Sequence, residues 1–255
     1  MAFFEANFYS ESLGFQTTVN VIMPQRSTSG QIGVEGNAGN GEYKCVYLLH
    51  GLSDDHSIWL RRTSIERYAD EYGICVVMPF GGKGFYTDMK YGEKYYTYIS
   101  EELPRLMEEF FGISQKRENN FIAGLSMGGY GALKIGLKNP DRYSACAGLS
   151  AVADIRGWTQ GCPDLMVSIF GENPQVPDSE DLFCIAEETN KLDVKPRVYM
   201  GVGTEDFLYD GNVELREKFE TLDFDYTYRE SAGTHCWTFW DEYIQYVLAW
   251  MFGDK

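Results

Sequence analysis

The sequence has few histidines and no long run of apolar residues. Both shortages reduce the number of functions that the protein could have. None of its apolar runs approaches the roughly 20 residues that a membrane-spanning helix needs. The first residues, MAFFEANFYSESLGF, lack a basic segment followed by an apolar core, so no secretory signal is expected there. These absences predict a cytoplasmic protein that does not associate with membranes.

Paired cysteine motifs and an excess of basic residues are also missing. No C-x-x-C pair occurs, and Cys45, Cys75 and Cys146 lie in apolar runs, as buried thiols of a reducing compartment do. Lys and Arg number 22 against 38 Asp and Glu, which gives a net charge of −16. So acidic a surface repels phosphate backbones, so nucleic acid is not an expected partner. A small-molecule substrate is expected, and a homo-oligomer remains open.

What the 255 residues do contain is a regular alternation of short apolar runs and amphipathic segments. A strand-and-helix alternation of this kind predicts an α/β fold, with a mostly parallel central sheet and helices on both faces. The first run alternates and predicts an edge or antiparallel strand, whereas the later ones are continuous, as in strands covered on both faces. The predicted strands are Thr17–Pro24, Lys44–Gly51, Gly73–Pro79, NFIAGL, YSACAGLS, RVYMGVG and FDYTYRES.

Helices are predicted between these strands. SIERYADEYG suits a short helix that ends at Gly73. The span Tyr98–Phe111 has an apolar stripe, and Pro104 requires either that its helix begin near Ser100 or that it be kinked. The last segment, FWDEYIQYVLAWMF, places its aromatic residues at helical spacing, which is typical of core packing.

Two segments stand apart from this alternation. Ser27–Glu42 is rich in Gly, Ser and Asn, which predicts a loop or hairpin turn. Ser150–Pro196 is too long for a simple crossover and contains a predicted helix at Ser179–Asn190. We therefore predict a single domain over residues 1–255, with an insertion at about 150–196 that lies near the active-site cleft, before the strand that carries the catalytic acid.

A serine lies between glycines in GLSMG, residues 124–128, directly after the apolar run NFIAGL and before a helical pattern. This G-x-S-x-G pattern is typical of a sharp strand-to-helix turn that exposes a nucleophilic hydroxyl. Side chains at the flanking positions would collide, which explains the glycines. Ser126 is therefore the predicted nucleophile.

A serine hydroxyl needs a base, and the chain has three histidines. His235 lies in the loop SAGTHCW between the last predicted strand and helix, where it can reach the serine. A carboxylate must orient that base, and Asp206 follows the strand RVYMGVG, with Glu205 in reserve. The order Ser126, Asp206, His235 is that of α/β-hydrolases.

The developing oxyanion needs two backbone N–H donors. One is expected from Met127, which follows the nucleophile, and the other from Leu52, in the loop after the strand that ends at His50. Gly51 lets that loop approach closely. His50 is expected to shape the loop rather than act as the base.

The chain resembles the esterase D family of α/β-hydrolases over nearly its whole length. The resemblance rests on the segments FFEANFYSESLGFQTTVNVIMP, YLLHGLSDDHSIWLRRTSIERYA, FIAGLSMGGYGALKIGLKNPDRY, GTEDFLY and GTHCWTFWDEYI. That family includes tributyrin-type carboxylesterases, S-formylglutathione hydrolases, and feruloyl and acetyl xylan esterases. The resemblance implies the same triad of Ser126, Asp206 and His235, and the sequence itself shows no lid domain of the lipase kind.

The predicted function is that of a serine carboxylesterase that hydrolyses short-chain acyl esters through an acyl-enzyme. Acetyl or feruloyl esters of plant sugars are candidate substrates, and an acyltransferase or an S-formylglutathione hydrolase is the alternative. No cofactor or metal is expected. Substrate contacts are predicted at the loop after His50, at the glycine-rich Pro79–Gly92 loop, in the insertion and beside His235. The candidates are His50, Tyr86, Asp88, Trp158, Met166, Phe170 and Trp237.

Overall fold

The computed structural model describes residues 1–25 and 42–253 and contains one eight-stranded sheet of order β1-β2-β4-β3-β5-β6-β7-β8. β1 pairs with β2, and β2 with β4, in antiparallel fashion, while all the other pairs are parallel. The predicted α/β class with a mostly parallel sheet is confirmed. The strands are β1 Ala2–Ser10, β2 Phe15–Met23, β3 Cys45–Leu49, β4 Cys75–Pro79, β5 Asn120–Leu125, β6 Ala145–Leu149, β7 Arg197–Gly203 and β8 Tyr226–Ser231.

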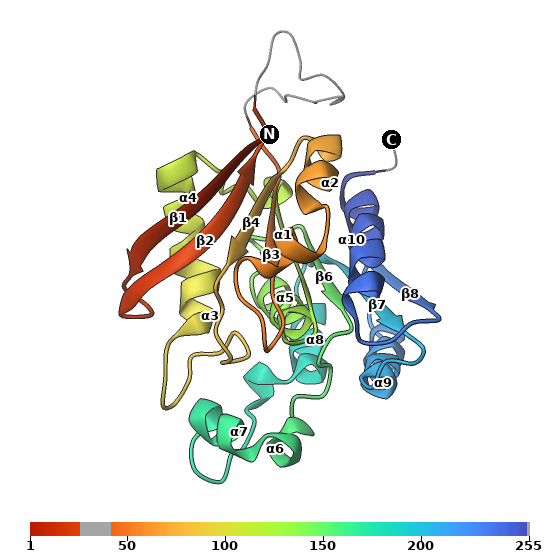
Figure 1. Cartoon of the computed structure of the whole chain (residues 1–255). Helices are drawn as coiled ribbons and strands as arrows, with labels where there is room; N and C mark the ends of the chain where they lie inside the picture. The colour runs from red at the N-terminus through yellow and green to blue at the C-terminus, as the bar shows by residue number, and fades with distance from the viewer. Residues whose placement is uncertain (26–41, 254–255) are drawn as a thin grey trace.

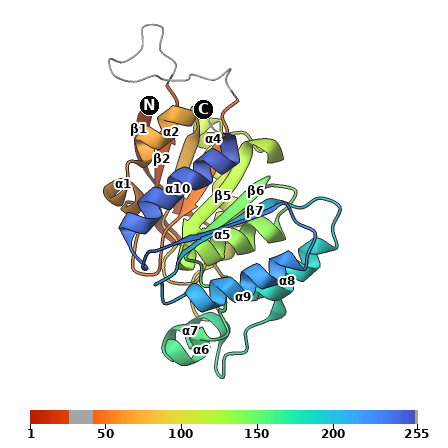
Figure 2. The ribbon, with the colours of Figure 1, turned by 90° about the vertical axis from the view of Figure 1, so that its right-hand side faces the viewer.

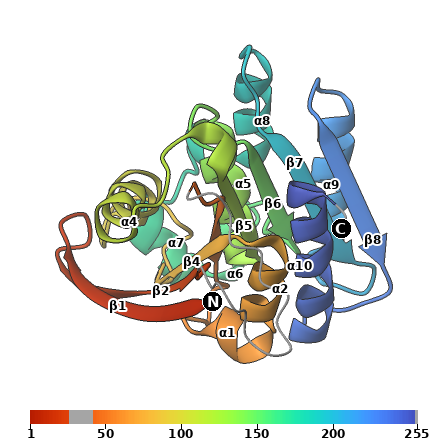
Figure 3. The same cartoon turned by 90° about the horizontal axis from the view of Figure 1, so that it is seen from above.

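Helices cover both faces of the sheet (Figures 1–3). α1, α2 and α10 pack one apolar cluster against one face, and α4, α5, α8 and α9 pack a second cluster against the other. The α-helices are α1 Ile58–Arg62, α2 Ile65–Tyr72, α3 Tyr95–Thr97, α4 Leu103–Phe111, α5 Met127–Lys138, α6 Trp158–Gly161, α7 Pro163–Phe170, α8 Leu182–Asn190, α9 Tyr209–Glu220 and α10 Trp237–Phe252. The short helical turns are η1 Tyr98–Glu102, η2 Arg117–Asn119 and η3 Asp178–Glu180.

The central strands are hidden on both faces, as their continuous apolar sequences predict. Every residue of β3, β5 and β6 is buried. Strands with two covered faces gain by burying apolar side chains at every position, which explains why they do not alternate. All these parallel strands point in one direction, so their carboxyl ends form a single edge where loops can meet.

The predicted helices are present, although the helix predicted over Ser179–Asn190 begins only at Leu182, as α8, after the short turn η3. α2 ends at Gly73, whose φ of +63° is the left-handed cap that glycine supplies. Pro104 lies in the first turn of α4, where its missing N–H costs nothing, and a π-helical turn, η1, precedes it. The predicted loop over Ser27–Glu42 falls outside the described residues except for Glu42.

The segment between β6 and β7 contains α6, α7, η3 and α8, and α6 and α7 lie at the end of the molecule away from the two chain termini (Figure 1). A buried ion pair ties this segment to α5. Lys134 Nζ lies 2.6 Å from Glu180 Oε2 of η3, and its side chain has no exposed surface. Lys134 also donates to Thr87 Oγ1 at 2.7 Å and to the Phe85 carbonyl at 3.2 Å. One side chain therefore joins α5, η3 and the loop after β4.

Within residues 1–25 and 42–253, no helix combines the length and the apolar character needed to cross a lipid bilayer.

Candidate active site

Ser126 forms a strained corner between β5 and α5. Its φ of +54° and ψ of −120° lie outside the regions that side chains favour. A Cβ on Gly124 would lie 2.3 Å from the Gly128 carbonyl oxygen, and one on Gly128 would lie 2.5 Å from the His50 carbonyl oxygen. Both contacts are with backbone, which cannot move aside. The two flanking glycines are therefore required by the packing around the corner.

The corner presents Ser126 to an imidazole and a carboxylate. His235 Nε2 lies 3.0 Å from Ser126 Oγ, and His235 Nδ1 lies 2.9 Å from Asp206 Oδ2 and 3.0 Å from Oδ1. Ser126 follows β5, Asp206 follows β7 and His235 follows β8, so three loops at the same edge of the sheet supply the three residues. The structure thus brings together the three residues that the sequence singled out.

Asp206 is held as a carboxylate in a buried position. Burial raises the pKa of its carboxyl, but hydrogen bonds from His235 and from the Leu208 N–H outweigh burial, so the pKa is lowered overall. The Leu208 N–H donates to Oδ1 at 2.9 Å. An ionised carboxylate against Nδ1 fixes the proton on that nitrogen, which leaves Nε2 free to accept one from Ser126.

Glu205, the reserve acid, is used elsewhere. Its carboxylate accepts a hydrogen bond from the Gly233 N–H, and the Glu205 N–H donates to the Gly233 carbonyl at 2.9 Å. These contacts close the loop that carries His235. Between the two carboxylates, the geometry selects Asp206 as the partner of the imidazole.

The loop after β3 lies against the nucleophile. A Cβ on Gly51 would be 2.9 Å from Leu125 Cδ1 and 3.7 Å from Ser126 Cβ, so this backbone passes close to the corner. Leu52 follows in that loop, and Met127 is the first residue of α5, whose first-turn N–H groups have no partner within the helix. Met127 thus follows Ser126 directly in sequence, and Leu52 lies in a loop that passes the corner, while their role as oxyanion donors stays a prediction.

His50 fixes the shape of this loop through two hydrogen bonds. Its Nδ1 donates to the Gly51 carbonyl at 2.7 Å, and its Nε2 accepts from the Gly81 N–H at 2.8 Å. Burial lowers the pKa of His50 to about 4. With both nitrogens engaged and the ring hidden, His50 links the loops after β3 and β4 and does not act as a base.

Three of the predicted substrate contacts are wrong, because the structure buries the side chains in the interior. His50 is 1% exposed, and Tyr86 and Met166 have no exposed surface. The Tyr86 hydroxyl donates to the His50 carbonyl at 2.9 Å, so it supports the oxyanion loop from inside. Phe85 and Tyr86 both have positive φ values, +51° and +52°, and this backbone conformation turns their rings into the core.

The other predicted contacts are at least partly exposed. The Asp88 carboxylate is engaged by the end of α3, where it accepts from the Thr97 N–H at 2.9 Å and from the Thr97 hydroxyl at 2.6 Å. Phe170 packs against the core, and Trp237 packs edge-on against Trp59. Trp158 lines a cavity together with Phe207 and Leu208, the two residues that follow Asp206.

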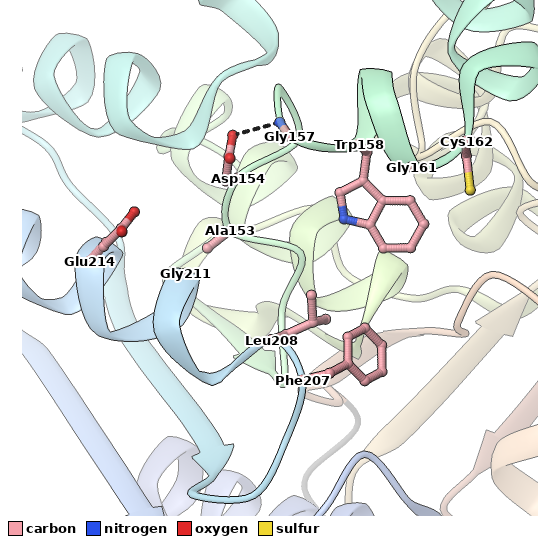
Figure 4. Close-up of a pocket in the computed structure, with 10 residues that line it drawn as sticks. All are labelled: Ala153, Asp154, Gly157, Trp158, Gly161, Cys162, Phe207, Leu208, Gly211 and Glu214. Atoms are coloured by element: carbon pink, nitrogen blue, oxygen red, sulfur yellow. Dashed lines mark hydrogen bonds between the residues drawn. The ribbon is translucent and has the colours of Figure 1, made fainter.

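That cavity has a volume of about 450 Å³ and opens between α6, the start of α9 and the loop after Asp206. Trp158 and Phe207 are its aromatic lining, with Leu208 beside them (Figure 4). Asp154 and Glu214 add two carboxylates to the lining, and a hydrogen bond of 3.1 Å from the Gly157 N–H holds Asp154 (Figure 4).

Sequence reasoning missed two aromatic residues that enclose the imidazole. The Phe207 ring is 71% exposed and lies 4.5 Å, centroid to centroid, from the His235 ring. Trp240 packs edge-on against the His235 ring at 4.7 Å, centroid to centroid, and its Nε1 donates to Ser150 Oγ. The position of Phe207 directly after Asp206 was the available signal.

Residues 1–25 and 42–253 contain no cluster of three His, Cys, Asp or Glu side chains that could hold a metal ion. Asp55, in the acidic stretch SDDHSIW, instead accepts hydrogen bonds from the Ser57 N–H at 2.8 Å and the Ser57 hydroxyl at 2.6 Å.

Comparisons with known proteins identify the family and the fold of the chain. Residues 10–251 match the model of the family described as "Putative esterase". An acetyl esterase of Caldicellulosiruptor saccharolyticus is 31% identical, over 98% of each chain. The fluorophosphonate-binding serine hydrolase FphF of Staphylococcus aureus is 31% identical, with a TM-score of 0.87 and 99% of each chain covered. The S-formylglutathione hydrolase FrmB of the same organism is 30% identical, with a TM-score of 0.85 and 98% of each chain covered.

Proposed function

The chain belongs to the "Putative esterase" family and is a serine carboxylesterase, and from this premise we propose that Ser126, His235 and Asp206 are its catalytic triad. The observation that carries this proposal is the continuous line of hydrogen bonds from Ser126 Oγ through His235 to Asp206. A nucleophile, a base and an orienting carboxylate in that arrangement are what acyl transfer to a serine requires.

The first half of the reaction forms an acyl-enzyme. Ser126 Oγ attacks the ester carbonyl carbon while its proton passes to His235 Nε2. The carbonyl oxygen becomes an oxyanion, which the N–H groups of Leu52 and Met127 stabilise, and each such donor contributes roughly 3 kcal/mol in the transition state. The carbon–oxygen bond to the alcohol then breaks, and His235 gives its proton to the departing alcohol oxygen.

The second half releases the acid. A water molecule gives a proton to His235 Nε2 and attacks the acyl carbon, and the bond to Ser126 Oγ breaks as that oxygen takes the proton back. Asp206 stays ionised throughout and stabilises the imidazolium that forms twice in each cycle.

For the substrate, we propose short acyl esters, with acetyl esters of polyhydroxylated alcohols first. The choice of the acetyl group rests on the identity to the acetyl esterase, which extends over 98% of this chain. The second candidate is an S-formylglutathione thioester, because a hydrolase of that thioester is 30% identical. We further propose that the enzyme works in the cytoplasm, without nucleic acid as a partner, in accordance with its net charge of −16.

The triad is tested by Ser126→Ala, with Ser179→Ala as a matched control, since Ser179 is exposed on η3. We expect kcat/KM on p-nitrophenyl acetate to fall by at least about 10⁴-fold in Ser126→Ala and to stay within twofold in the control. Covalent labelling by a fluorophosphonate probe should disappear in the same variant. Ordinary hydrolysis by Ser126→Ala would contradict the proposal.

The substrate class is tested by kcat/KM on a matched panel: p-nitrophenyl acetate, butyrate and octanoate, methyl ferulate, an acetylated xylo-oligosaccharide and S-formylglutathione. A tenfold or greater preference for the acetylated sugar supports the first candidate. The same preference for S-formylglutathione supports the second. Transfer of the acyl group to added glycerol, measured as monoacylglycerol, would instead assign an acyltransferase.

A further inference from the structure

A cavity lies beside the triad. Its lining includes Trp158, Phe207, Leu208, Asp154 and Glu214. We infer that it receives the alcohol half of the ester and selects against alcohols that carry negative charge. We call it the alcohol pocket. The inference rests on the proposed function, since it assumes hydrolysis at Ser126.

The position of the imidazole indicates which half of the ester enters. The departing alcohol oxygen must lie within hydrogen-bond reach of His235 Nε2, because it takes its proton from there. Phe207 packs on the His235 ring and also lines the cavity, so the cavity adjoins the imidazole. The oxyanion loop at Gly51 and Leu52 is not part of its lining. The alcohol leaves on the imidazole side, where Phe207 joins the His235 ring to this cavity.

The lining combines aromatic faces with carboxylates. The Trp158 and Phe207 rings offer apolar contact to a carbon skeleton. Asp154 accepts one hydrogen bond through Oδ1, from the Gly157 N–H, and the exposed Glu214 side chain adds a second carboxylate from α9. Carboxylates accept hydrogen bonds from hydroxyl groups and attract cations.

No basic side chain offsets these charges in the lining of the described pocket. The nearest arginine in sequence, Arg156, is already paired with Asp178 at 2.7 Å and with Asp181. An anionic alcohol placed there meets two like charges, while a cationic alcohol meets two opposite ones. The pocket therefore suits polyhydroxylated or cationic alcohols and disfavours a leaving group such as glutathione, which has two carboxylates and one ammonium.

Three acetate esters of nearly equal size test this selection. Acetylcholine has a cationic alcohol, 3,3-dimethylbutyl acetate is its uncharged counterpart, and acetyl isethionate has an anionic one. All three form the same acetyl-enzyme, so their deacylation is identical. Differences in kcat/KM then report the binding of the alcohol half and the acylation step alone.

We expect kcat/KM to fall in the order acetylcholine, 3,3-dimethylbutyl acetate, acetyl isethionate, by about fivefold for each step at low ionic strength. The spread should shrink as salt is added, because these charges are partly exposed to solvent. The double variant Asp154→Asn/Glu214→Gln should bring the ratio of cationic to anionic ester close to one. Asn at position 154 can still accept the Gly157 hydrogen bond through Oδ1.

A control separates the pocket from the acidic surface as a whole. Glu217 also lies on α9, outside the lining, so Glu217→Gln removes one negative charge without altering the pocket. We expect that variant to keep the wild-type ratio of kcat/KM for the cationic ester to kcat/KM for the anionic ester.

The inference would be overturned if this ratio were the same in Glu217→Gln and in the double variant. Equal kcat/KM for all three esters would also overturn it. If none of the three is hydrolysed although p-nitrophenyl acetate is, the inference fails while the proposed function stands. Loss of all ester hydrolysis would instead refute the proposed function.

Discussion

At the scale of single residues, the roles of the two neighbouring acids are the sharpest test of the site. Asp206 contacts His235 Nδ1 with both carboxylate oxygens, whereas Glu205 contacts Gly233. Asp206→Asn should lower kcat by about 10⁴-fold, because an amide cannot stabilise the imidazolium or hold the productive tautomer. The measurement is kcat on p-nitrophenyl acetate.

Glu205→Gln is the matched control for that substitution, since it makes the same chemical change one residue away. Its amide oxygen can still accept the hydrogen bond from the Gly233 N–H. We expect kcat within about threefold of wild type. A larger loss in Glu205→Gln than in Asp206→Asn would exchange the roles of the two acids.

His50 gives a prediction about stability rather than rate. Its pKa is lowered by burial from 6.5 to about 4, so between these values the unfolded chain binds a proton that the folded chain does not. Above pH 6.5 neither state binds this proton, so the folded state has its full stability. As the pH falls from 6.5 toward 4, the unfolded state gains the proton first, and the free energy of unfolding decreases. The loss amounts to about 3 kcal/mol in the free energy of unfolding.

Urea unfolding of the wild type and of His50→Gln at pH 7 and pH 4.5 measures this contribution. Gln can accept the Gly81 N–H but has no proton to gain in this range. We expect the wild type to lose about 2 kcal/mol more than the variant over this pH interval. Equal losses in both proteins would show that His50 does not titrate as its burial implies.

At the scale of elements, the Lys134–Glu180 pair joins α5 to η3 and to the loop after β4. Burial raises the pKa of the Glu180 carboxyl, but Lys134 outweighs this, so the pKa of Glu180 is lowered overall. Removing Glu180 leaves Lys134 as an uncompensated buried charge, so Glu180→Gln should lower the free energy of unfolding by about 3 to 5 kcal/mol. Lys134→Met should cost less, because Glu180 keeps Lys138 at 3.5 Å.

The double variant Lys134→Met/Glu180→Gln leaves no unpaired charge, so we expect it to be more stable than either single variant. Lys191→Met is the control for an exposed ion pair. Lys191 pairs with Glu188, and the Lys191 side chain is 65% exposed. Its expected effect on the free energy of unfolding is below about 0.5 kcal/mol. A double variant as unstable as the sum of the single ones would show that the two residues act independently.

The elements also show what could and could not be predicted from sequence. Strands β3, β4, β5, β6 and β7 were found because each is a continuous apolar run between turn residues. β1 was missed because the edge strand AFFEANFYS is largely exposed and has aromatic residues on both faces, so no alternation marks it. α9 was missed because few apolar positions mark it: three of its twelve residues are buried, Asn212, Leu215 and Phe219, and one of these is polar.

Site residues follow the same division. Ser126 and the residues of its two partner loops were predictable, since motif, chain order and strand ends constrain them together. Tyr86 was not, because loop composition does not reveal backbone angles, and the positive φ at this position turns the ring inward. The lining of the alcohol pocket was largely beyond prediction for a related reason, as α6 and α9 meet only in three dimensions.

At the scale of the whole molecule, the sheet runs without a break from β1 to β8 and is covered on both faces. We propose that the chain is one domain and predict that it unfolds in one cooperative step, with the insertion included. Scanning calorimetry checks this, since the calorimetric and van't Hoff enthalpies should agree. Two separate transitions, or an early loss of the insertion detected by proteolysis, would contradict it.

The collisions around the serine corner have a consequence for how the enzyme can evolve. Any side chain at Gly124 or Gly128 meets main-chain atoms, so no second substitution among neighbouring side chains can make room for it. The alcohol pocket, in contrast, is lined by side chains of α6, α9 and the loop after Asp206, which can be exchanged one at a time. Laboratory selection for new esters should therefore accumulate substitutions in that lining, while the glycines beside Ser126 stay fixed in every surviving lineage.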